Sequence, residues 1–327
     1  MLAARLHAFG RAADVLSLDE LDLTPPAPDE VRLEMLASPV NPADLNVIEG
    51  TYGQLPDLPA IPGNEGVGRV AALGAAVTAL RPGDLVAPLG SGSWCGARNV
   101  PADRVVPLPA GVDPHQASMI TVNPPTAYAL LHDFAALASG DWVVQNAANS
   151  GVGRCVIQLA RRLGLRTLNV VRRPELIDEL LALGADRVVL DNTDLRTTGA
   201  ALMGGASARL ALNAVGGASA LNLANALAPG SPLVTYGAMA RQPLKIPNGL
   251  LIFGGLSFHG FWLRSWFRDK PTAEQHRIFG LLGEMLRDGT IHVPIHRTFP
   301  LREIQTALAE AVADRRGGKV LLDLQAR

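Results

Sequence analysis

The sequence of 327 residues is long enough for two domains of ordinary size, and 48% of its residues are hydrophobic, so it can bury a substantial core. Its formal net charge of -1 gives no reason to expect a nucleic-acid partner or a membrane surface. Two cysteines, Cys95 and Cys155, are too few for a disulfide framework or a four-thiolate zinc site. They fit a reducing compartment, and we expect a cytoplasmic protein.

The amino terminus does not have the pattern of an export signal. Arg5, His7 and Arg11 interrupt any apolar region, and a strand-like pattern begins almost at once. The longest uncharged stretch, Leu210–Ala240, is divided by glycine, proline and asparagine into short pieces. It predicts a buried strand, a helix and another buried strand rather than a membrane span.

Residues 1 to about 115 are predicted to be rich in β-strand. Short apolar runs alternate with proline and glycine clusters, and no long helical pattern interrupts them. The runs are Val31–Leu36, Val67–Leu73, Leu85–Leu89 and Arg104–Leu108. From Pro114 to Phe134 the hydrophobic period becomes helical.

Strands and helices then alternate, which predicts an α/β fold with a doubly wound parallel sheet. The predicted strands are Trp142–Ala147, Arg166–Val171, Arg187–Leu190, Arg209–Val215, Leu233–Tyr236 and one near Leu256–Trp262. The predicted helices between them are Gly151–Leu163, Pro174–Leu183 and Ala218–Leu227. The chain ends with a helix, a strand, a helix and a strand, predicted at about Thr272–Leu286, Val293–Phe299, Leu301–Ala313 and Lys319–Leu324.

A loop of small residues follows the first of these strands and opens the first helix. Against the dinucleotide-binding pattern G-x-G-x-x-G, Ala148 and Ser150 replace the first two glycines, and Gly153 is the third. Small residues let the backbone approach a pyrophosphate, and the helix N-terminus offers free N–H groups. The pattern predicts a nucleotide site; a tight turn without a ligand is the alternative.

Two arginines, Arg172 and Arg173, follow the second predicted strand, where NAD-preferring folds carry a carboxylate for the ribose hydroxyls. A carboxylate would repel a 2′-phosphate, whereas guanidinium groups bind it through charge-assisted hydrogen bonds. This favours NADP(H) as the cofactor. The alternative is a pair of solvated surface arginines.

A β-rich domain followed by a nucleotide domain resembles the medium-chain dehydrogenase/reductase superfamily. The zinc-ligand positions of that superfamily match Asn41 and Asn64, and neutral amides are poor zinc ligands beside thiolate or imidazole. None of the seven histidines has a ligand-like spacing: His292 and His296 lie in a strand pattern with a proline between them. We therefore expect no metal.

Seven segments, in order over most of the chain, resemble a narrower family, the mitochondrial-type trans-2-enoyl-thioester reductases. They are Asn41–Gly53, Pro62–Gly68, Val122–Tyr128, Gln145–Gly153, Leu212–Gly217, Thr235–Met239 and Gly260–Leu263. These enzymes use NADPH in fatty-acid synthesis, on acyl-carrier-protein or coenzyme A thioesters. The resemblance implies that the 2,3 double bond of the enoyl thioester receives a hydride at Cβ and a proton at Cα. The lack of the eukaryotic targeting extension suggests a bacterial member.

The resemblance also implies the site residues. The catalytic tyrosine of the family matches Tyr52. Its nucleotide contacts match Asn123, Asn149, Ser150, Gly151, Val152, Arg172, Arg173, Tyr236, Gly237, Ala238, Met239, Phe261, Trp262, Leu263, Arg264 and Lys319. The chain departs from the family at Ala238, where the family has glycine, and its segment after Arg172 is shorter.

Tyr52 has suitable chemistry for the proton at Cα. A phenol is neutral at pH 7 and can donate, and the flanking Gly50 and Gly53 let the loop approach a cleft. Without the resemblance, a packed loop tyrosine would be the ordinary interpretation. Since no metal is expected, hydrogen-bond donors would have to stabilise the thioester enolate.

Two further groups have both functional and structural interpretations. The first group is aromatic: Phe261, Trp262 and Trp266. These side chains would either line an acyl pocket or pack between the domains. The second group is basic: Arg264, Arg268 and Lys270. It would either bind coenzyme A phosphates or an acidic carrier protein, or form a solvated face.

We expect a GroES-like catalytic domain, residues 1–117 and 266–327, and a Rossmann NADP(H)-binding domain, residues 118–265. The resemblance implies a homodimer joined through the nucleotide domains. A zinc-free NADPH:quinone reductase is an alternative function, and a non-catalytic NADPH-binding sensor is another. The presence of Tyr52, both arginines and Lys319 argues against the sensor.

Overall fold

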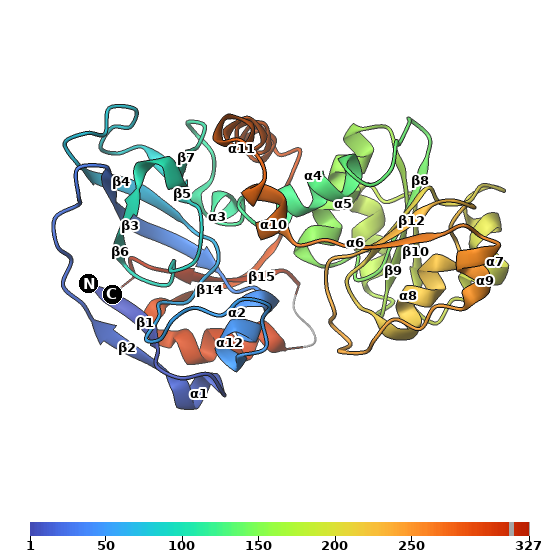
Figure 1. The fold of residues 1–327 in the computed structure, drawn as a ribbon, viewed down its shortest axis with the longest axis horizontal. Helices are drawn as coiled ribbons and strands as arrows, with labels where there is room; N and C mark the ends of the chain where they lie inside the picture. Colours follow the sequence, from blue (N-terminus) through green and yellow to red (C-terminus); the bar gives the residue numbers. More distant parts are fainter. Residues whose placement is uncertain (314–316, 327) are drawn as a thin grey trace. The chain divides into compact units, whose positions relative to one another are not determined.

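The computed structural model describes residues 1–313 and 317–326, and the chain divides into two compact units (Figure 1). Unit 1 is formed by Met1–Val122 and Pro271–Arg327, and unit 2 by Asn123–Lys270. The predicted domain boundaries fall after residues 117 and 265. Along the chain, the boundaries between the compact units fall after Val122 and after Lys270.

Unit 2 is built on a six-stranded parallel sheet in the order β10-β9-β8-β11-β12-β13. This order reverses direction between β8 and β11, as it does at the switch point of a Rossmann fold. The central strands are buried on both faces, which explains their continuous apolar sequence. The strands are β8 (Trp142–Gln145), β9 (Arg166–Val171), β10 (Arg187–Leu190), β11 (Leu210–Asn213), β12 (Pro232–Thr235) and β13 (Ser257–Gly260).

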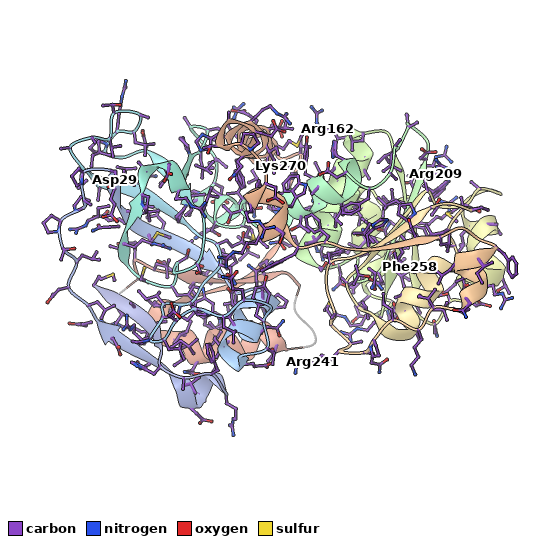
Figure 2. All side chains as sticks on the ribbon, in the orientation of Figure 1. Asp29, Arg162, Arg209, Arg241, Phe258 and Lys270 are labelled. Atoms are coloured by element: carbon purple, nitrogen blue, oxygen red, sulfur yellow. The ribbon has the colours of Figure 1, made fainter. Side chains whose placement is uncertain are left out.

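Helices cover both faces of this sheet (Figure 1). One face carries α4 (Asn123–His132), α5 (Gly151–Arg162) and α6 (Leu176–Leu183). The other carries α7 (Leu195–Leu202), α8 (Gly217–Ala224) and α9 (Asn248–Ile252). The edge strand β13 bears Phe258 (Figure 2), which packs against the core. A short helix, α10 (Leu263–Arg268), follows β13.

Unit 1 has a largely antiparallel seven-stranded sheet in the order β14-β15-β3-β4-β5-β7, with β6 paired to β3, and a separate two-stranded sheet. Both chain ends contribute, since β14 and β15 come from the C-terminal part. The strands are β1 (Leu2–Leu6), β2 (Leu16–Glu20), β3 (Glu30–Pro39), β4 (Val67–Leu73), β5 (Leu85–Pro88), β6 (Ala97–Pro101), β7 (Val105–Pro107), β14 (Ile295–Pro300) and β15 (Lys319–Asp323).

The helices of unit 1 surround a core that includes the buried side chains of Met35, Trp94 and Phe299. They are α1 (Ala12–Val15), α2 (Pro42–Glu49), α3 (Pro114–Ala117), α11 (Thr272–Arg287) and α12 (Ile304–Val312), with single 3-10 turns at Ala102–Arg104 and Leu301–Glu303. The helical period predicted from Pro114 to Phe134 corresponds to two separate helices, α3 and α4. In the described ranges, no helix is long and apolar enough to cross a membrane.

Candidate active site

The loop between β8 and α5 has the geometry of a phosphate-binding turn. Ala147 begins it with a φ of 46°, a left-handed conformation that is uncommon for residues other than glycine. Ser150 ends it as the N-cap of α5, and its Oγ accepts a hydrogen bond from the Gly153 amide at 3.1 Å. The loop therefore presents the N-terminus of a 12-residue helix, with its positive dipole end, at one edge of the sheet.

Close packing requires the glycine in this loop. A Cβ on Gly153 would lie 2.5 Å from the carbonyl oxygen of Ala148, a backbone atom that cannot move aside easily. The neighbouring Arg154 is only 4% exposed; its Nε donates to the carbonyl oxygen of Asn149 at 3.1 Å, and it pairs with Glu179 at 2.6 Å. Arg154 was not predicted as part of the site, because an arginine in an amphipathic helix ordinarily indicates a solvated position.

The two predicted phosphate-binding arginines have different surroundings. Arg172 is exposed at the end of β9 and lines a pocket of about 370 Å³. The rest of the lining follows or ends β10 and consists of Leu190, Asp191 and Asn192. Arg173 is half-buried and lies 3.7 Å from a carboxylate oxygen of Glu175. Of the two arginines, Arg172 is therefore the one that lines this pocket.

The segment after β12, Tyr236–Met239, runs beside the end of β11. Its first and last amides donate to carbonyl oxygens there, each at 3.0 Å, and a Cβ on Gly237 would lie 2.9 Å from the oxygen of Ala214. Ala238 is exposed and does not have a positive φ, so the methyl group that replaces the family's glycine causes no strain. Burial raises the pKa of Tyr236 above its ordinary value, so this phenol stays protonated at neutral pH.

The segment after β13 contributes aromatic side chains. The ring of Phe261 lies edge-on to Phe134, with centroids 6.0 Å apart, and 6.3 Å from Trp266. Trp262 is 37% exposed, and Leu263 and Arg264 follow it in the first turn of α10. Phe261 and Trp266 thus pack within unit 2, and Trp262 is the more exposed of the three predicted pocket aromatics.

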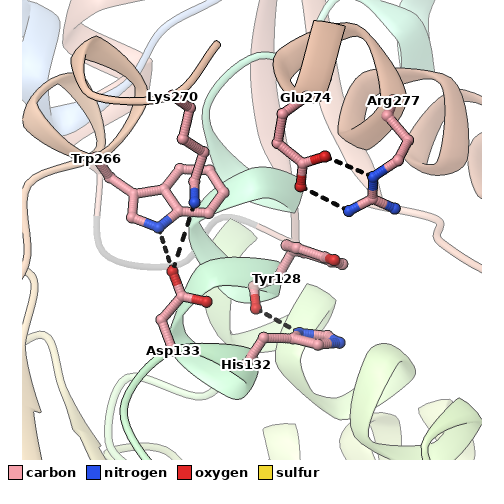
Figure 3. Close-up of polar contacts among 7 residues, drawn as sticks. All are labelled: Tyr128, His132, Asp133, Trp266, Lys270, Glu274 and Arg277. Atoms are coloured by element: carbon pink, nitrogen blue, oxygen red, sulfur yellow. Dashed lines mark hydrogen bonds and ion pairs between the residues drawn. The ribbon is translucent and has the colours of Figure 1, made fainter.

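Lys270 and Trp266 share one carboxylate partner (Figure 3). The indole Nε1 of Trp266 donates to Asp133, while Lys270 Nζ lies 3.9 Å from the same oxygen and 4.3 Å from the centroid of the indole ring. Arg268 pairs with the adjacent Asp269 at 3.2 Å. Lys270 is therefore paired within unit 2, which favours a structural role for this lysine, whereas Arg268 is 71% exposed and remains a solvated surface cation.

Tyr52 lies in unit 1, in the loop after α2. Gly50 ends the helix with a φ of 77°, and the amide of Thr51 donates to the carbonyl oxygen of Asn46 at 2.9 Å. The chain turns away from the helix there, and Tyr52 is half-buried two residues later.

A cluster of five polar side chains, largely buried, stands at the N-terminus of α2: Asn41, Asp44, Asn64, Glu65 and Lys319. The Nδ2 of Asn41 donates to Glu65 at 2.7 Å, and its Oδ1 accepts from Lys319. The Oδ1 of Asp44 accepts from the amide and the side chain of Asn64 at 2.9 and 2.7 Å. The two asparagines at the superfamily's zinc-ligand positions are thus engaged with carboxylates and, at Asn41, with an ammonium group.

The charges of this cluster are only partly developed at neutral pH. Burial raises the pKa of Asp44 to about 6 and that of Glu65 to about 7, although Lys319 and several hydrogen bonds oppose the shift. Lys319, predicted as a nucleotide contact, thus has its identified polar partner within unit 1. Asp44 and Glu65 were not singled out, although the Asn-Pro-Ala-Asp sequence is a recognisable helix start.

Most of the predicted nucleotide contacts lie at the carboxyl edge of the unit 2 sheet, since each group follows a parallel strand. The loop Asn149–Val152 follows β8, and Arg172 and Arg173 follow β9. The segments Tyr236–Met239 and Phe261–Arg264 follow β12 and β13. Asn123 is instead the first residue of α4, and Tyr52 and Lys319 belong to unit 1. Among residues 1–313 and 317–326, no group of three histidine, cysteine or acidic side chains has metal-binding geometry.

Two family models match the chain. The alcohol dehydrogenase GroES-like domain matches residues 27–110, and the zinc-binding dehydrogenase domain matches residues 151–276. With the six-stranded parallel sheet, these matches confirm the predicted fold class, a GroES-like domain plus a Rossmann domain.

Curated relatives cover nearly the whole chain. The mitochondrial enoyl-[acyl-carrier-protein] reductase of Xenopus tropicalis is 40% identical over 95% of this chain and 92% of that protein. The reductases of the same name from Homo sapiens and Dictyostelium discoideum are 42% and 36% identical, over 91% and 99% of this chain and 82% and 95% of those proteins.

Solved structures agree with these sequence matches. The complex of Etr1p with NADP and crotonyl-CoA has a TM-score of 0.90 at 28% identity, covering 98% of this chain and 99% of that chain. A Bacillus thuringiensis structure named as an NADPH:quinone reductase has a TM-score of 0.91 at 30% identity, covering 98% of each chain.

Proposed function

The chain belongs to the enoyl-[acyl-carrier-protein] reductase family represented by the mitochondrial enzymes, and from this premise we propose that it reduces trans-2-enoyl thioesters with NADPH. The hydride would go to Cβ and the proton to Cα. The observation that carries the proposal is the match at 36–44% identity over most of the chain with reductases of this one name.

The nucleotide edge of unit 2 supports NADPH as the cofactor. The helix N-terminus capped by Ser150 suits a pyrophosphate, and Gly153 lets α5 pack closely against the backbone of Ala148 in the preceding loop. The guanidinium group of Arg172 would bind a 2′-phosphate. The carboxylate of Asp191 lines the same pocket and opposes this binding, but it accepts a hydrogen bond from Ser219. When bound, the nucleotide supplies the hydride.

The remaining chemistry would come from the side chains of the protein. We assign proton donation at Cα to the hydroxyl of Tyr52, a contribution that typically reaches about 10²- to 10⁴-fold. A hydrogen-bond donor would stabilise the thioester oxygen as negative charge develops on it. The cluster of Asn41, Asp44, Asn64, Glu65 and Lys319 uses its donors and acceptors internally, so we propose a reaction without metal.

A homodimer in a reducing, cytoplasmic compartment completes the proposal. Cys95 and Cys155 are both buried and form no disulfide with each other, as expected in such a compartment. Strand β13 is an edge of the unit 2 sheet, and several large apolar side chains are exposed between Met239 and Phe253. The related structure of an Etr1p/Etr2p heterodimer from Candida tropicalis is an example of two such chains that assemble as a pair.

The test is oxidation of NADPH with crotonyl-CoA, with NADH and a simple quinone run in parallel and a chelator added to one series. We expect chelator-resistant turnover of crotonyl-CoA with NADPH, lowered about 10²- to 10⁴-fold in Tyr52→Phe. Tyr128→Phe removes a tyrosine hydroxyl from α4 and is the matched control. Turnover of the quinone alone would support a quinone reductase instead, and NADPH binding without any turnover would support the sensor.

The cofactor assignment has its own test in Arg172→Gln. Loss of the charge that meets the 2′-phosphate should raise KM for NADPH by roughly 10- to 100-fold and leave KM for NADH unchanged. Arg162→Gln, at the exposed end of α5 (Figure 2), is the control for loss of a surface charge. Equal effects on both nucleotides would contradict the assignment.

A further inference from the structure

Asn146, the residue between β8 and the phosphate-binding loop, is 1% exposed and makes four hydrogen bonds. Its amide donates to the carbonyl oxygen of Leu212 at 3.2 Å, and its Oδ1 accepts from the amide of Ala214 at 2.8 Å. Its Nδ2 donates to Asn213 Oδ1 at 2.9 Å and to Ser219 Oγ at 3.1 Å. Asn146 therefore ties the end of β8 to the end of β11 and to α8.

The partners of Asn146 extend these bonds along the carboxyl edge of the sheet. Asn213 donates to Thr235 Oγ1 at 3.1 Å, at the end of β12. Ser219 donates to Asp191 at 2.8 Å, and Asp191 lines the pocket that also contains Arg172. One side-chain network thus joins the pocket after β10 to the end of β12, and Asn146 is its central member.

Asn146 also immediately precedes the strained residue of the loop. Ala147 has a positive φ, and a non-glycine residue keeps such a conformation only where its surroundings determine it. Before Ala147, the side chain of Asn146 fixes the loop through hydrogen bonds from both Nδ2 hydrogens and to its oxygen. After Ala147, Arg154 binds the carbonyl oxygen of Asn149, and Ser150 caps α5.

The geometry points to Asn146 as a positioning residue for nucleotide binding, one that holds the phosphate-binding loop in its strained turn and in register with the ends of β11 and α8. The inference rests on the proposed use of NADPH. Asn146 acts through the loop backbone, so its loss should weaken nucleotide affinity and leave the chemical step unchanged. An aspartate at this position has nearly the same shape but would set its oxygen against the acceptor oxygen of Asn213.

The experiment measures the Kd for NADPH by calorimetry and steady-state kinetics with crotonyl-CoA for wild type, Asn146→Asp, Asn146→Ala and Ser219→Ala. We expect both Asn146 variants to raise the Kd and the KM for NADPH by roughly 10- to 100-fold. At saturating NADPH, kcat and the KM for crotonyl-CoA should stay within about twofold of wild type. Ser219→Ala removes one bond of the network and should have a smaller effect in the same direction.

The matched control is Gln116→Ala in unit 1. Gln116 is 4% exposed and bonds both the amide and the carbonyl oxygen of Val293, at 3.0 and 2.9 Å, so its loss also removes a buried amide clamp. It should lower Tm and leave the Kd for NADPH unchanged. Should Asn146→Ala fail to fold, the nearly isosteric Asn146→Asp carries the comparison.

Three results would overturn the inference. One is an unchanged Kd for NADPH in a folded Asn146→Asp. Another is a fall in kcat at saturating NADPH with no change in KM, because Asn146 would then act on the chemical step. Failure of the wild-type protein to bind NADPH would end both the inference and the proposed function, whereas binding by wild type with unaltered variants would end the inference alone.

Discussion

Lys319 is a buried cation whose neighbours are two buried carboxyls, Asp44 and Glu65, and the amide oxygen of Asn41. Removal of one partner from such a group leaves the others without compensation, which typically costs about 3–5 kcal/mol. We expect Lys319→Met to lower the free energy of unfolding by about this amount at pH 8, measured without nucleotide in urea. The loss should shrink toward pH 5, where both carboxyls take up protons.

The matched control for this variant is Lys245→Met, which removes an exposed lysine of unit 2. It should change the free energy of unfolding by less than about 0.5 kcal/mol. A Lys319→Met protein as stable as wild type at pH 8 would mean that the ammonium group does not compensate the carboxyls.

Glu65 should make the stability of the protein depend on pH. Burial raises its pKa from the ordinary value of 4.5 to about 7. Between these pH values the carboxyl therefore keeps its proton in the folded state and loses it in the unfolded state. The contribution of Glu65 to stability is therefore greatest below about pH 4.5 and falls as the pH rises through 7. Glu65→Gln cannot ionise, and we expect a smaller fall in unfolding free energy between pH 5 and pH 8.

The glutamine also loses an acceptor, because Glu65 Oε1 accepts from Asn41 and Oε2 from the amide of Val122. This should subtract about 1 kcal/mol at pH 8, where the carboxylate accepts through both oxygens, and less at pH 5, where the protonated carboxyl also has only one carbonyl oxygen. The slope, and not the absolute stability, is therefore the relevant quantity. Glu34→Gln, at an exposed position of β3, should keep the wild-type slope. An identical slope in Glu65→Gln would show that Glu65 does not titrate in this range.

At the scale of residues, the sequence could predict those candidate site residues that lie in a recognisable local pattern. The loop after β8 stands between a strand and a helix, and Arg172 directly follows the next strand, β9. Asn146, Arg154 and Lys319 belong to no such pattern, because the groups they bind are remote in sequence or come together only after folding. Their burial follows from tertiary packing, which no local pattern contains.

At the scale of elements, the contact of α5 with the preceding loop gives a sharp prediction. The Cβ of Gly153→Ala would approach the carbonyl oxygen of Ala148 to 2.5 Å, so the helix would have to shift away from β8. Overpacking of this kind costs about 1–3 kcal/mol, and we expect a lower Tm together with weaker NADPH binding. Differential scanning calorimetry and titration with NADPH measure the two effects.

Gly280→Ala is the control for this change in a helix. Gly280 lies within α11, and a Cβ there would meet nothing within 4 Å outside its own helix. This substitution should be neutral or raise stability by up to about 1 kcal/mol, because alanine favours a helix more than glycine does. A Gly153→Ala protein that behaved in the same way would contradict the close approach of α5.

The sequence predicted the strands of unit 2 and the long helices better than the short helices. Strands β4, β9 and β10 have the predicted bounds, and α5 and α11 differ from them by one residue at one end. The short helices α2, α7, α9 and α10 were missed, since five to eight residues hold too few turns for a clear hydrophobic period. The missed α2 matters most, because it carries Asp44 and leads to the loop of Tyr52.

At the scale of the whole molecule, the exposed apolar residues near β13 bear on assembly. The side chains of Ile252 and Phe253 are 70% and 87% exposed, beside the edge of the unit 2 sheet. If this face joins two copies of the chain, Phe253→Glu should raise the dimer dissociation constant by at least about tenfold in analytical ultracentrifugation. Val312→Glu, at a residue 65% exposed in α12, should leave the dimer intact. A monomeric wild-type protein at micromolar concentration would contradict the dimer.

The division of the molecule into two units could be predicted from one change in the sequence of predicted strands and helices. Short strands with proline and glycine between them gave way to regular strand–helix alternation, and the structure has a β-rich unit and a parallel-sheet unit accordingly. The return of the chain to unit 1 after Lys270 was less visible, because α10 and α11 both lie near that point and only β14 and β15 join the first sheet.

The central claim is that hydride from NADPH reaches Cβ of an enoyl thioester. The most direct measurement incubates the protein with crotonyl-CoA and NADPH that carries deuterium on C4 of the nicotinamide, prepared as each stereoisomer, and analyses the acyl product by mass spectrometry and NMR. We predict butyryl-CoA with one deuterium at C3, from one of the two stereoisomers only. Unlabelled crotonyl-CoA recovered beside oxidised nucleotide, or oxidation of NADPH only when a quinone is the acceptor, would contradict the account.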